Sequence, residues 1–117
     1  MIGAIAAGLA VIGGAFGAHT LEGRVSPDRL ETFTTGVTYQ MYHALALLFV
    51  GWALTQWPAM MPLTWAGWCF VVGICIFSGS LYALVLTDTS WLGAVTPIGG
   101  VAFIVGWVLL AWGVWQG

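Results

Sequence analysis

Four long runs of apolar residues divide the chain, and none shows the alternation of apolar and polar positions that marks a half-buried β-strand. A helix that crosses a membrane needs about 20 mostly apolar residues. The runs that approach or meet this length are residues 2–18, 37–57, 63–86 and 96–115. Without period-two alternation they do not fit a membrane β-barrel. The pattern therefore predicts an all-α protein with four transmembrane helices.

The segment between the first two runs carries a helix start signal. Ser26 followed by Pro27 is typical of an N-cap and a first helical position, and Asp28 adds an acid to the first turn. We therefore expect a short interfacial helix over residues 27–36, directly before the second span.

The fourth span has two possible starts. Thr96 and Pro97 repeat the N-cap pattern, which favours a helix that begins there. The apolar residues 91–95 also permit a helix from Ser90 in which Pro97 introduces a kink. In both cases the connections are short, so we expect one domain over residues 1–117, an up-down bundle with both termini on one face.

The composition supports this fold class. Hydrophobic residues make up 61 % of the 117 residues and charged residues 5 %, against about 45–50 % and about 25 % in soluble domains. Two arginines and four acids cannot cover a water-exposed surface, and a net charge of −2 excludes a basic surface for nucleic acid. The chain is predicted to be a multi-pass membrane protein.

The charged residues fall in or near the first and third connections, so the bundle places all of them at one face. The opposite face has an uncharged, proline-containing turn and several tryptophans suited to an interfacial belt: Trp57, Trp65, Trp112 and Trp115. Counting only the two arginines would place the charged face in the cytoplasm.

Small residues recur at intervals of four or seven in the first, third and fourth spans. Lipid is as apolar as leucine, so helices in a membrane associate through close packing and hydrogen bonds. The glycines expected to pack between helices are Gly13, Gly17, Gly73, Gly99, Gly106 and Gly113. Such seams serve packing within the chain, and they could also join copies into a homo-oligomer or join the chain to a larger membrane complex.

Polar side chains at membrane depth gather in the half of the bundle near the charged face. Four of them recur every four residues along the second helix: Glu31, Thr35, Tyr39 and His43. Each is rotated by about 40° around the helix axis from the one before it. Such groups are costly in lipid, and each is a hypothesis of function. The predicted polar cluster consists of His19, Glu31, Thr35, Tyr39, Gln40, His43, Ser78, Ser80, Tyr82 and Thr96.

Three interpretations of this cluster compete. The groups can hydrogen-bond to one another and hold the helices together. They can line a polar cavity for a small solute, an ion or a lipid headgroup, with His43 as the group that exchanges protons near neutral pH. Finally, His19 and His43 can ligate haem. No further histidine and no Cys–His pairing supports a metal cluster.

Catalytic motifs are absent. The chain has no G-x-S-x-G elbow, no P-loop, no dinucleotide-binding fingerprint and no H-E-x-x-H. Small four-helix proton-coupled exporters are similar in length but depend on a glutamate deep in the first span, whereas here Glu22 lies beyond that span. We therefore expect a non-enzymatic structural or accessory subunit that contacts membrane lipids and other spans and needs no cofactor.

Four segments carry a resemblance to a known family. They are GAFGAH (14–19), ETFTTGVTYQMYHALALL (31–48), FSGSLYALVLT (77–87) and TPIGGVAFIVGW (96–107). In this order they resemble the DUF423 family, which includes the eukaryotic transmembrane protein 256. The resemblance implies a small multi-pass membrane protein, which we expect in the bacterial inner membrane, and it carries no reaction. Bacterial members often have basic residues in the second connection and C-terminal tail, which would place the termini in the cytoplasm. This chain lacks those residues. By resemblance we expect the termini in the cytoplasm and the polar cluster toward the outer face.

Overall fold

The computed structural model describes residues 1–117, which form helices and no strand. Four helical segments are long and apolar enough to cross a membrane, which confirms the prediction of an all-α protein with four membrane-spanning helices. In chain order the elements are α1 (Ile2–Phe16), the π-helical turn η1 (Gly17–Leu21), α2 (Pro27–Gln56), α3 (Met61–Gly73), the π-helical turn η2 (Ile74–Ser78), α4 (Gly79–Thr87), the 3₁₀ helix η3 (Ser90–Ala94) and α5 (Thr96–Gln116). Because α3, η2 and α4 continue one another, we call them together the third span.

The start of α2 confirms the capping prediction. Ser26 Oγ accepts a hydrogen bond from the Arg29 backbone N–H at 3.2 Å, and Pro27 is the first helical residue. From there α2 runs unbroken for 30 residues. The helix expected over residues 27–36 is therefore not a separate element: nothing in that segment ends a helix, so it forms the first third of α2.

The start of α5 corrects a second detail. The helix begins at Thr96, but its N-cap is Val95, and no side chain caps it. The Thr96 hydroxyl instead lies 2.6 Å from Ser80 Oγ and donates to the Leu92 carbonyl at 3.4 Å. The alternative start at Ser90 exists only as the separate helix η3. Thr96 is thus a contact to the third span and not a helix cap.

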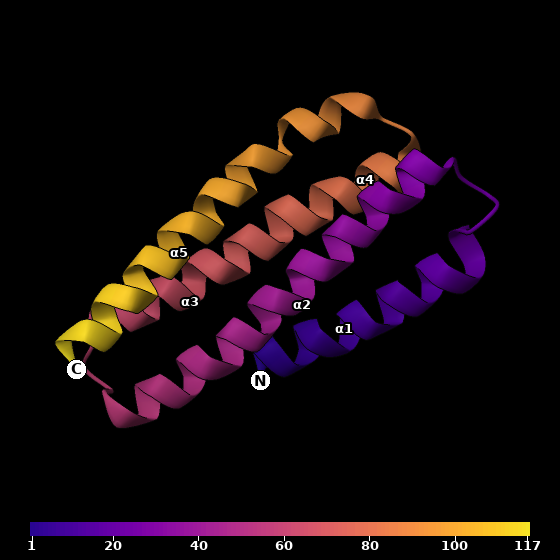
Figure 1. Ribbon diagram of the computed structural model, residues 1–117. Helices are drawn as coiled ribbons and strands as arrows, with labels where there is room; N and C mark the ends of the chain where they lie inside the picture. Colours follow the sequence, from indigo (N-terminus) through magenta and orange to yellow (C-terminus); the bar gives the residue numbers. More distant parts are fainter.

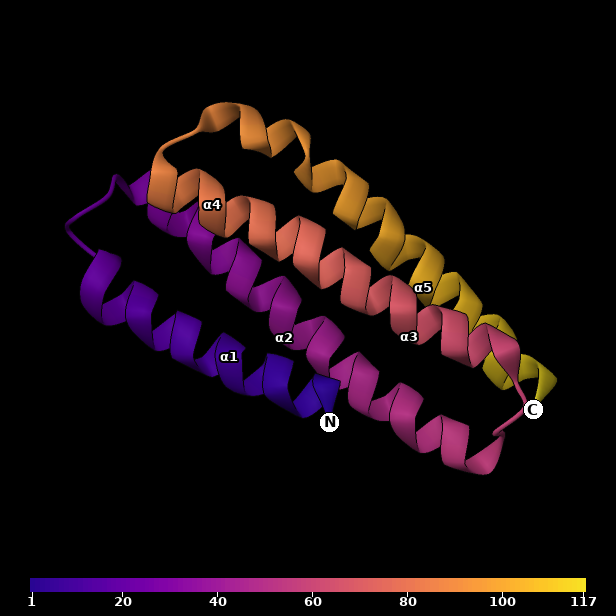
Figure 2. The same ribbon diagram turned by 180° about the vertical axis from the view of Figure 1, so that it is seen from behind.

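The helices pack in a zigzag row and not around a central axis. α1 lies against α2, α2 against the third span, and the third span against α5 (Figures 1 and 2). The row is flat, with extents of 49 × 26 × 16 Å. A groove therefore opens on each side of it: one between α2 and α5 over the third span, the other between α1 and the third span over α2.

Close backbone approach holds the third span against α5. Gly73, Gly99, Gly106 and Gly113 are all buried at this contact. A Cβ added at Gly99 would lie 2.8 Å from Phe77 Cα, and one at Gly106 would lie 2.7 Å from the Phe70 ring. Real Cβ contacts are never so short, so the two helices could not keep this separation with larger residues.

The glycines of α1 differ among themselves. A Cβ at Gly17 would come within 3.1 Å of the Phe33 ring, whereas one at Gly13 would make an ordinary contact with Val37 at 3.5 Å. Gly13 therefore does not require a close approach. The tight contact at the other end of α1 belongs to Gly3, where a Cβ would lie 2.9 Å from the Ala44 carbonyl oxygen.

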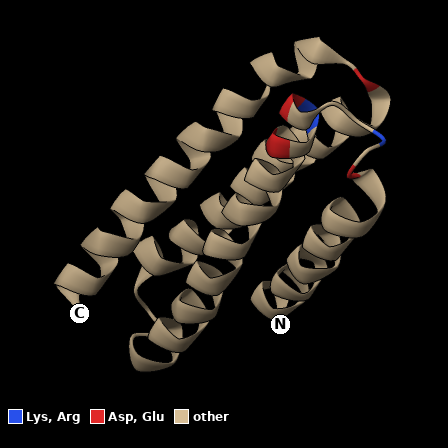
Figure 3. Ribbon diagram, turned by 45° about the vertical axis from the view of Figure 1, so that its right-hand side comes forward, with Lys and Arg blue, Asp and Glu red and all other residues tan.

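All charged side chains lie at one end of the molecule (Figure 3). There Arg29, in the first turn of α2, is bound to the third connection, because its Nη2 lies 3.1 Å from Asp88 Oδ1 and 2.9 Å from Ser90 Oγ. The opposite end and the helix surfaces between carry no charged side chain, as expected for spans in a bilayer.

Candidate functional site

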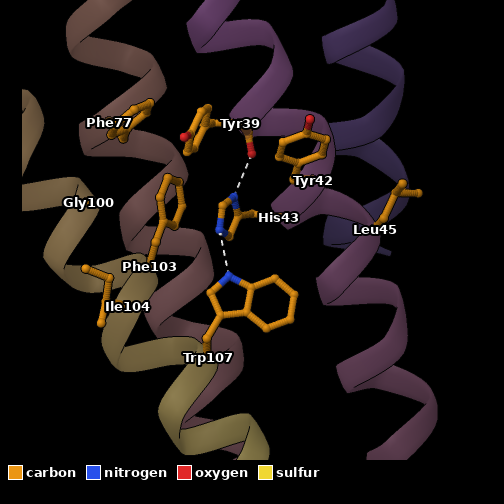
Figure 4. Close-up of a pocket in the computed structure, with 9 residues that line it drawn as sticks. All are labelled: Tyr39, Tyr42, His43, Leu45, Phe77, Gly100, Phe103, Ile104 and Trp107. Carbon is orange, nitrogen blue, oxygen red and sulfur yellow. Dashed lines mark hydrogen bonds between the residues drawn. The ribbon is translucent and has the colours of Figure 1, made fainter.

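His43 is buried on α2 and has a partner for each ring nitrogen. Nδ1 lies 2.7 Å from the Tyr39 carbonyl oxygen, and Nε2 lies 3.0 Å from the indole Nε1 of Trp107 on α5 (Figure 4). A carbonyl only accepts and an indole N–H only donates. Nδ1 therefore carries the ring proton, Nε2 accepts, and the imidazole is neutral. The ring joins α2 to α5, and both of its nitrogens are hydrogen-bonded to groups of the same chain.

Aromatic rings surround this bond. The His43 ring lies flat on Phe103, with centroids 3.5 Å apart and planes 7° apart. The Tyr39 ring is nearly parallel to both, at 18° to His43 and 24° to Phe103, and its centroid lies 4.7 Å from that of Phe77. Phe103 of α5 thus covers one face of the imidazole, and the Phe70 ring of the third span lies 5.5 Å from it between centroids. Apart from its two hydrogen-bond partners, the groups that surround the imidazole are aromatic rings.

The groove between α2 and α5 passes directly over these rings. Its volume is about 710 Å³, and its lining is mostly hydrophobic. The lining residues are Tyr39, Tyr42, His43, Leu45, Phe77, Gly100, Phe103, Ile104 and Trp107 (Figure 4). The Tyr42 hydroxyl points along α2 toward the charged end of the molecule, whereas the Tyr39 hydroxyl points toward Phe77 (Figure 4). The site is therefore an aromatic groove at membrane depth with His43 in its floor.

Gln40 makes a second tie, one turn from His43. Its Nε2 donates to the Ala6 carbonyl of α1 at 2.8 Å, and its Oε1 accepts from the Tyr82 hydroxyl of α4 at 2.6 Å. A single buried amide thus connects three helices. Its donor and acceptor ends face opposite neighbours.

Serines complete the set of interhelical bonds. Ser78 Oγ donates to the Gly36 carbonyl of α2 at 2.7 Å, and Ser80 Oγ lies 2.6 Å from Thr96 Oγ1 at the start of α5. No buried side-chain nitrogen or oxygen in the chain is left without a partner. Every pair of neighbouring helices in the row is therefore joined by at least one polar side chain.

The π-helical turn η2 positions Ser78 and Phe77. A π turn inserts one extra residue into a helix and shifts the faces that follow it. Here it places Ser78 toward α2 and Phe77 toward the groove, where Gly99 packs against the Phe77 backbone. The local sequence gave no signal for this turn.

Comparison with known proteins identifies the family. The profile described as "Protein of unknown function (DUF423)" matches residues 13–100, well over half of the chain. The chain belongs to the DUF423 family. It is 50 % identical to a UPF0382 membrane protein of Staphylococcus aureus (strain bovine RF122 / ET3-1) over 94 % of this chain and 88 % of the relative.

Two further relatives extend the similarity. UPF0382 membrane protein YwdK of Bacillus subtilis (strain 168) is 50 % identical over 94 % of this chain and 89 % of its own. A UPF0382 membrane protein of Staphylococcus saprophyticus is 47 % identical over 99 % and 95 %. No solved structure matches. With four membrane-spanning helices and bacterial membrane-protein relatives, this DUF423 protein is a small multi-pass protein of the cell membrane.

Three predicted members of the polar cluster lie apart from it in this DUF423 protein. His19 and Glu31 are exposed near the charged end, and the Thr35 hydroxyl donates to the Glu31 carbonyl of its own helix at 3.0 Å. On α2, residues four positions apart are rotated by about 40° around the helix axis. Glu31 is three such steps from His43, so the two side chains point about 120° apart.

The two histidines are not arranged to share a ligand. His19 follows Gly17, which lies beside Phe33, and Phe33 precedes His43 by ten residues, or about 15 Å along α2. Nε2 of His43 is also committed to Trp107. Joint haem ligation by this pair does not fit the structure, and no group of three His, Cys, Asp or Glu residues is placed to hold a metal ion.

Sequence reasoning missed Trp107, Phe103 and Phe77 in this DUF423 protein. Trp107 carried a usable signal, because it lies at the middle of α5, far from either interface. An indole N–H at that depth needs an acceptor, and the sequence offers few acceptors in the spans. The two phenylalanines carried none, since any apolar residue could occupy their positions.

Proposed function

We propose that this DUF423 protein is a non-enzymatic structural or accessory component of the cell membrane that assembles with another membrane protein. One observation carries the proposal: both ring nitrogens of His43 are bound inside the chain, to the Tyr39 carbonyl and the Trp107 indole. A general base, a proton carrier or a metal ligand needs a nitrogen that can reach its substrate. The side chain best suited to chemistry is here part of a helix contact.

The other polar groups follow the same pattern. Gln40 bonds to α1 and α4, and Ser78 bonds to the backbone of α2. In a bilayer such bonds each contribute about 0.6–2 kcal/mol to helix association. This supports a scaffold whose polar residues build the fold, and it does not favour a polar cavity for a solute or an ion around His43.

The helix α1 offers the most accessible surface for a partner. It packs on α2 alone, so most of its circumference faces outward. Exposed small residues, interrupted by one valine, follow one line along that outer face: Ala4, Gly8, Val11, Ala15 and Ala18. Small residues let helices approach closely in membranes. We expect a partner helix to pack there.

Purification from native membranes tests this function. An epitope-tagged chain extracted in mild detergent should elute as part of a defined larger complex, measured by light scattering and mass spectrometry. A single copy of the chain, recovered alone from native membranes, would contradict the accessory role.

Two glycine variants test the surface. Cβ atoms at Gly8 and Gly51 would meet nothing within 4 Å, so a bulky residue at either position leaves the fold intact. Gly8→Ile on α1 should reduce recovery of the complex, whereas Gly51→Ile on α2 should not. If the complex survives Gly8→Ile, the partner binds elsewhere on the chain.

A further inference from the structure

We propose that the groove between α2 and α5 binds an isoprenoid quinone, with the quinone ring against the aromatic floor and the prenyl tail in the bilayer. The proposal concerns binding alone and involves no electron transfer. It goes beyond the accessory role and does not depend on it.

The size of the groove suits a small molecule. Its 710 Å³ falls within the range of about 300–1,000 Å³ typical of ligand sites. Because the groove lies between two helices of a flat row, it opens sideways into hydrocarbon, where a long apolar tail can remain.

The ring planes favour a flat ligand. The rings of Tyr39, His43 and Phe103 lie within 24° of one another, so they present one common stacking direction. Tyr39 is the outermost of the three and is 40 % exposed. A planar ring that enters the groove can continue this stack against it, whereas a saturated chain gains nothing from parallel ring planes.

Two hydroxyl groups favour a ligand with carbonyl oxygens. Neither Tyr39 nor Tyr42 makes a side-chain hydrogen bond within the chain, and a phenol without an acceptor is costly in hydrocarbon. A quinone brings two carbonyl acceptors on one flat ring. Tyr39 and Tyr42 both line the groove, and their hydroxyls, which point in different directions (Figure 4), are the donors available to such a ligand.

The depth of these hydroxyls argues against a phospholipid as the occupant. Tyr39 and Tyr42 follow Glu31, the last charged residue of α2, by 8 and 11 residues, or about 12 and 16 Å along the helix. They lie inside the span, while the ester groups of a phospholipid lie at the interface. An acyl chain would fill the groove and leave both hydroxyls without an acceptor.

The test is a binding titration with menaquinone-4 on the full-length chain in phosphatidylglycerol nanodiscs. Bound quinone is counted by native mass spectrometry, and quenching of tryptophan emission gives the affinity, since Trp107 lines the groove. We expect saturable binding of one menaquinone-4 per chain. Phytol, a prenyl chain without carbonyl groups, serves as the tail-only probe and should bind at least about tenfold more weakly.

Variants assign the site. Tyr39→Phe with Tyr42→Phe removes only the hydroxyls and should weaken menaquinone-4 binding about tenfold. Ile104→Trp fills the groove from its exposed wall and should abolish saturable binding. Val72→Trp, at an exposed position outside the groove, is the matched control and should bind like the natural chain. Circular dichroism confirms that each variant is folded.

Three results would overturn the proposal. They are the absence of saturable menaquinone-4 binding, equal binding of phytol, and binding that survives both the paired tyrosine change and Ile104→Trp. Equal binding of phytol would show a general site for apolar chains.

Discussion

Trp107 donates its indole N–H to Nε2 of His43 over 3.0 Å, and this bond joins two helices that otherwise meet across a groove. The same imidazole is bonded to the Tyr39 carbonyl and stacked on Phe103. A residue that the sequence marks as the most reactive in the membrane is thus the centre of a packing contact.

Replacing either partner should destabilise the fold, and replacing both should cost less than the sum. His43→Leu and Trp107→Phe each remove one interhelical bond worth about 0.6–2 kcal/mol, and after one change the other group has no partner left to lose. Thermal unfolding of the single and double variants in detergent measures this coupling. Trp68→Phe, at an exposed tryptophan without a hydrogen bond, is the control and should be nearly neutral. Strict additivity would show that the two residues do not interact.

The second prediction concerns the contact of the third span with α5. Gly99→Ala should destabilise the protein by several kcal/mol or prevent folding, because the new Cβ would meet the Phe77 backbone, which cannot rotate away. Gly79→Ala should be neutral or slightly stabilising, since a Cβ there meets nothing within 4 Å and alanine favours a helix. The yield and the melting temperature of the two variants measure this difference in stability. Equal behaviour would contradict the close approach.

The third prediction concerns the attachment of α1. Gln40→Leu removes the bond to the Ala6 carbonyl and the acceptor of Tyr82. Since α1 packs on α2 alone, its amides should exchange faster with deuterium while those of α5 stay protected. Tyr82→Phe keeps the bond to Ala6 and should leave α1 protected. Uniform loss of protection in all four spans would show that Gln40 supports the whole fold and not α1 in particular.

The spans were predictable because each one is a long apolar run bounded by proline, serine or charge, and the Ser26 cap has a direct physical signature. The gathering of the charges at one end followed from the connections. The direction in which each helix face points relative to its neighbours was not predictable. The rotation of successive residues around α2 makes Glu31 point away from His43. The π turn at Ile74–Ser78 changes which side chains of the third span face α2, and its sequence carries no signal for it.

The polar cluster shows the same limit. Composition and depth selected Gln40, His43 and Ser78, all of which are buried and bonded. The partner of each depends on how two helices are rotated relative to each other, and an apolar sequence does not encode that locally. Trp107 was therefore overlooked, although its N–H needs an acceptor.

A fourth prediction concerns the turn at the charged end. Asp88 has φ = 53°, in the left-handed region that asparagine and aspartate tolerate better than β-branched residues. Asp88→Asn should keep the turn and lose only its exposed contact with Arg29, a change within about 1 kcal/mol. Asp88→Val should cost more, about 1–2 kcal/mol of backbone strain. Melting temperatures compare the two variants, and a larger loss in Asp88→Asn would show that the ion pair matters more than the backbone.

The most direct test of the account is the protonation pattern of the His43 ring, measured by nitrogen-15 NMR on histidine-labelled protein in lipid at neutral pH. A His19→Asn variant leaves His43 as the only histidine and assigns its signals. The account predicts a neutral ring with the proton on Nδ1 and an Nε2 that accepts a hydrogen bond, the pattern changing in Trp107→Phe. A doubly protonated ring, or a proton on Nε2, would contradict the claim that His43 is a helix tie.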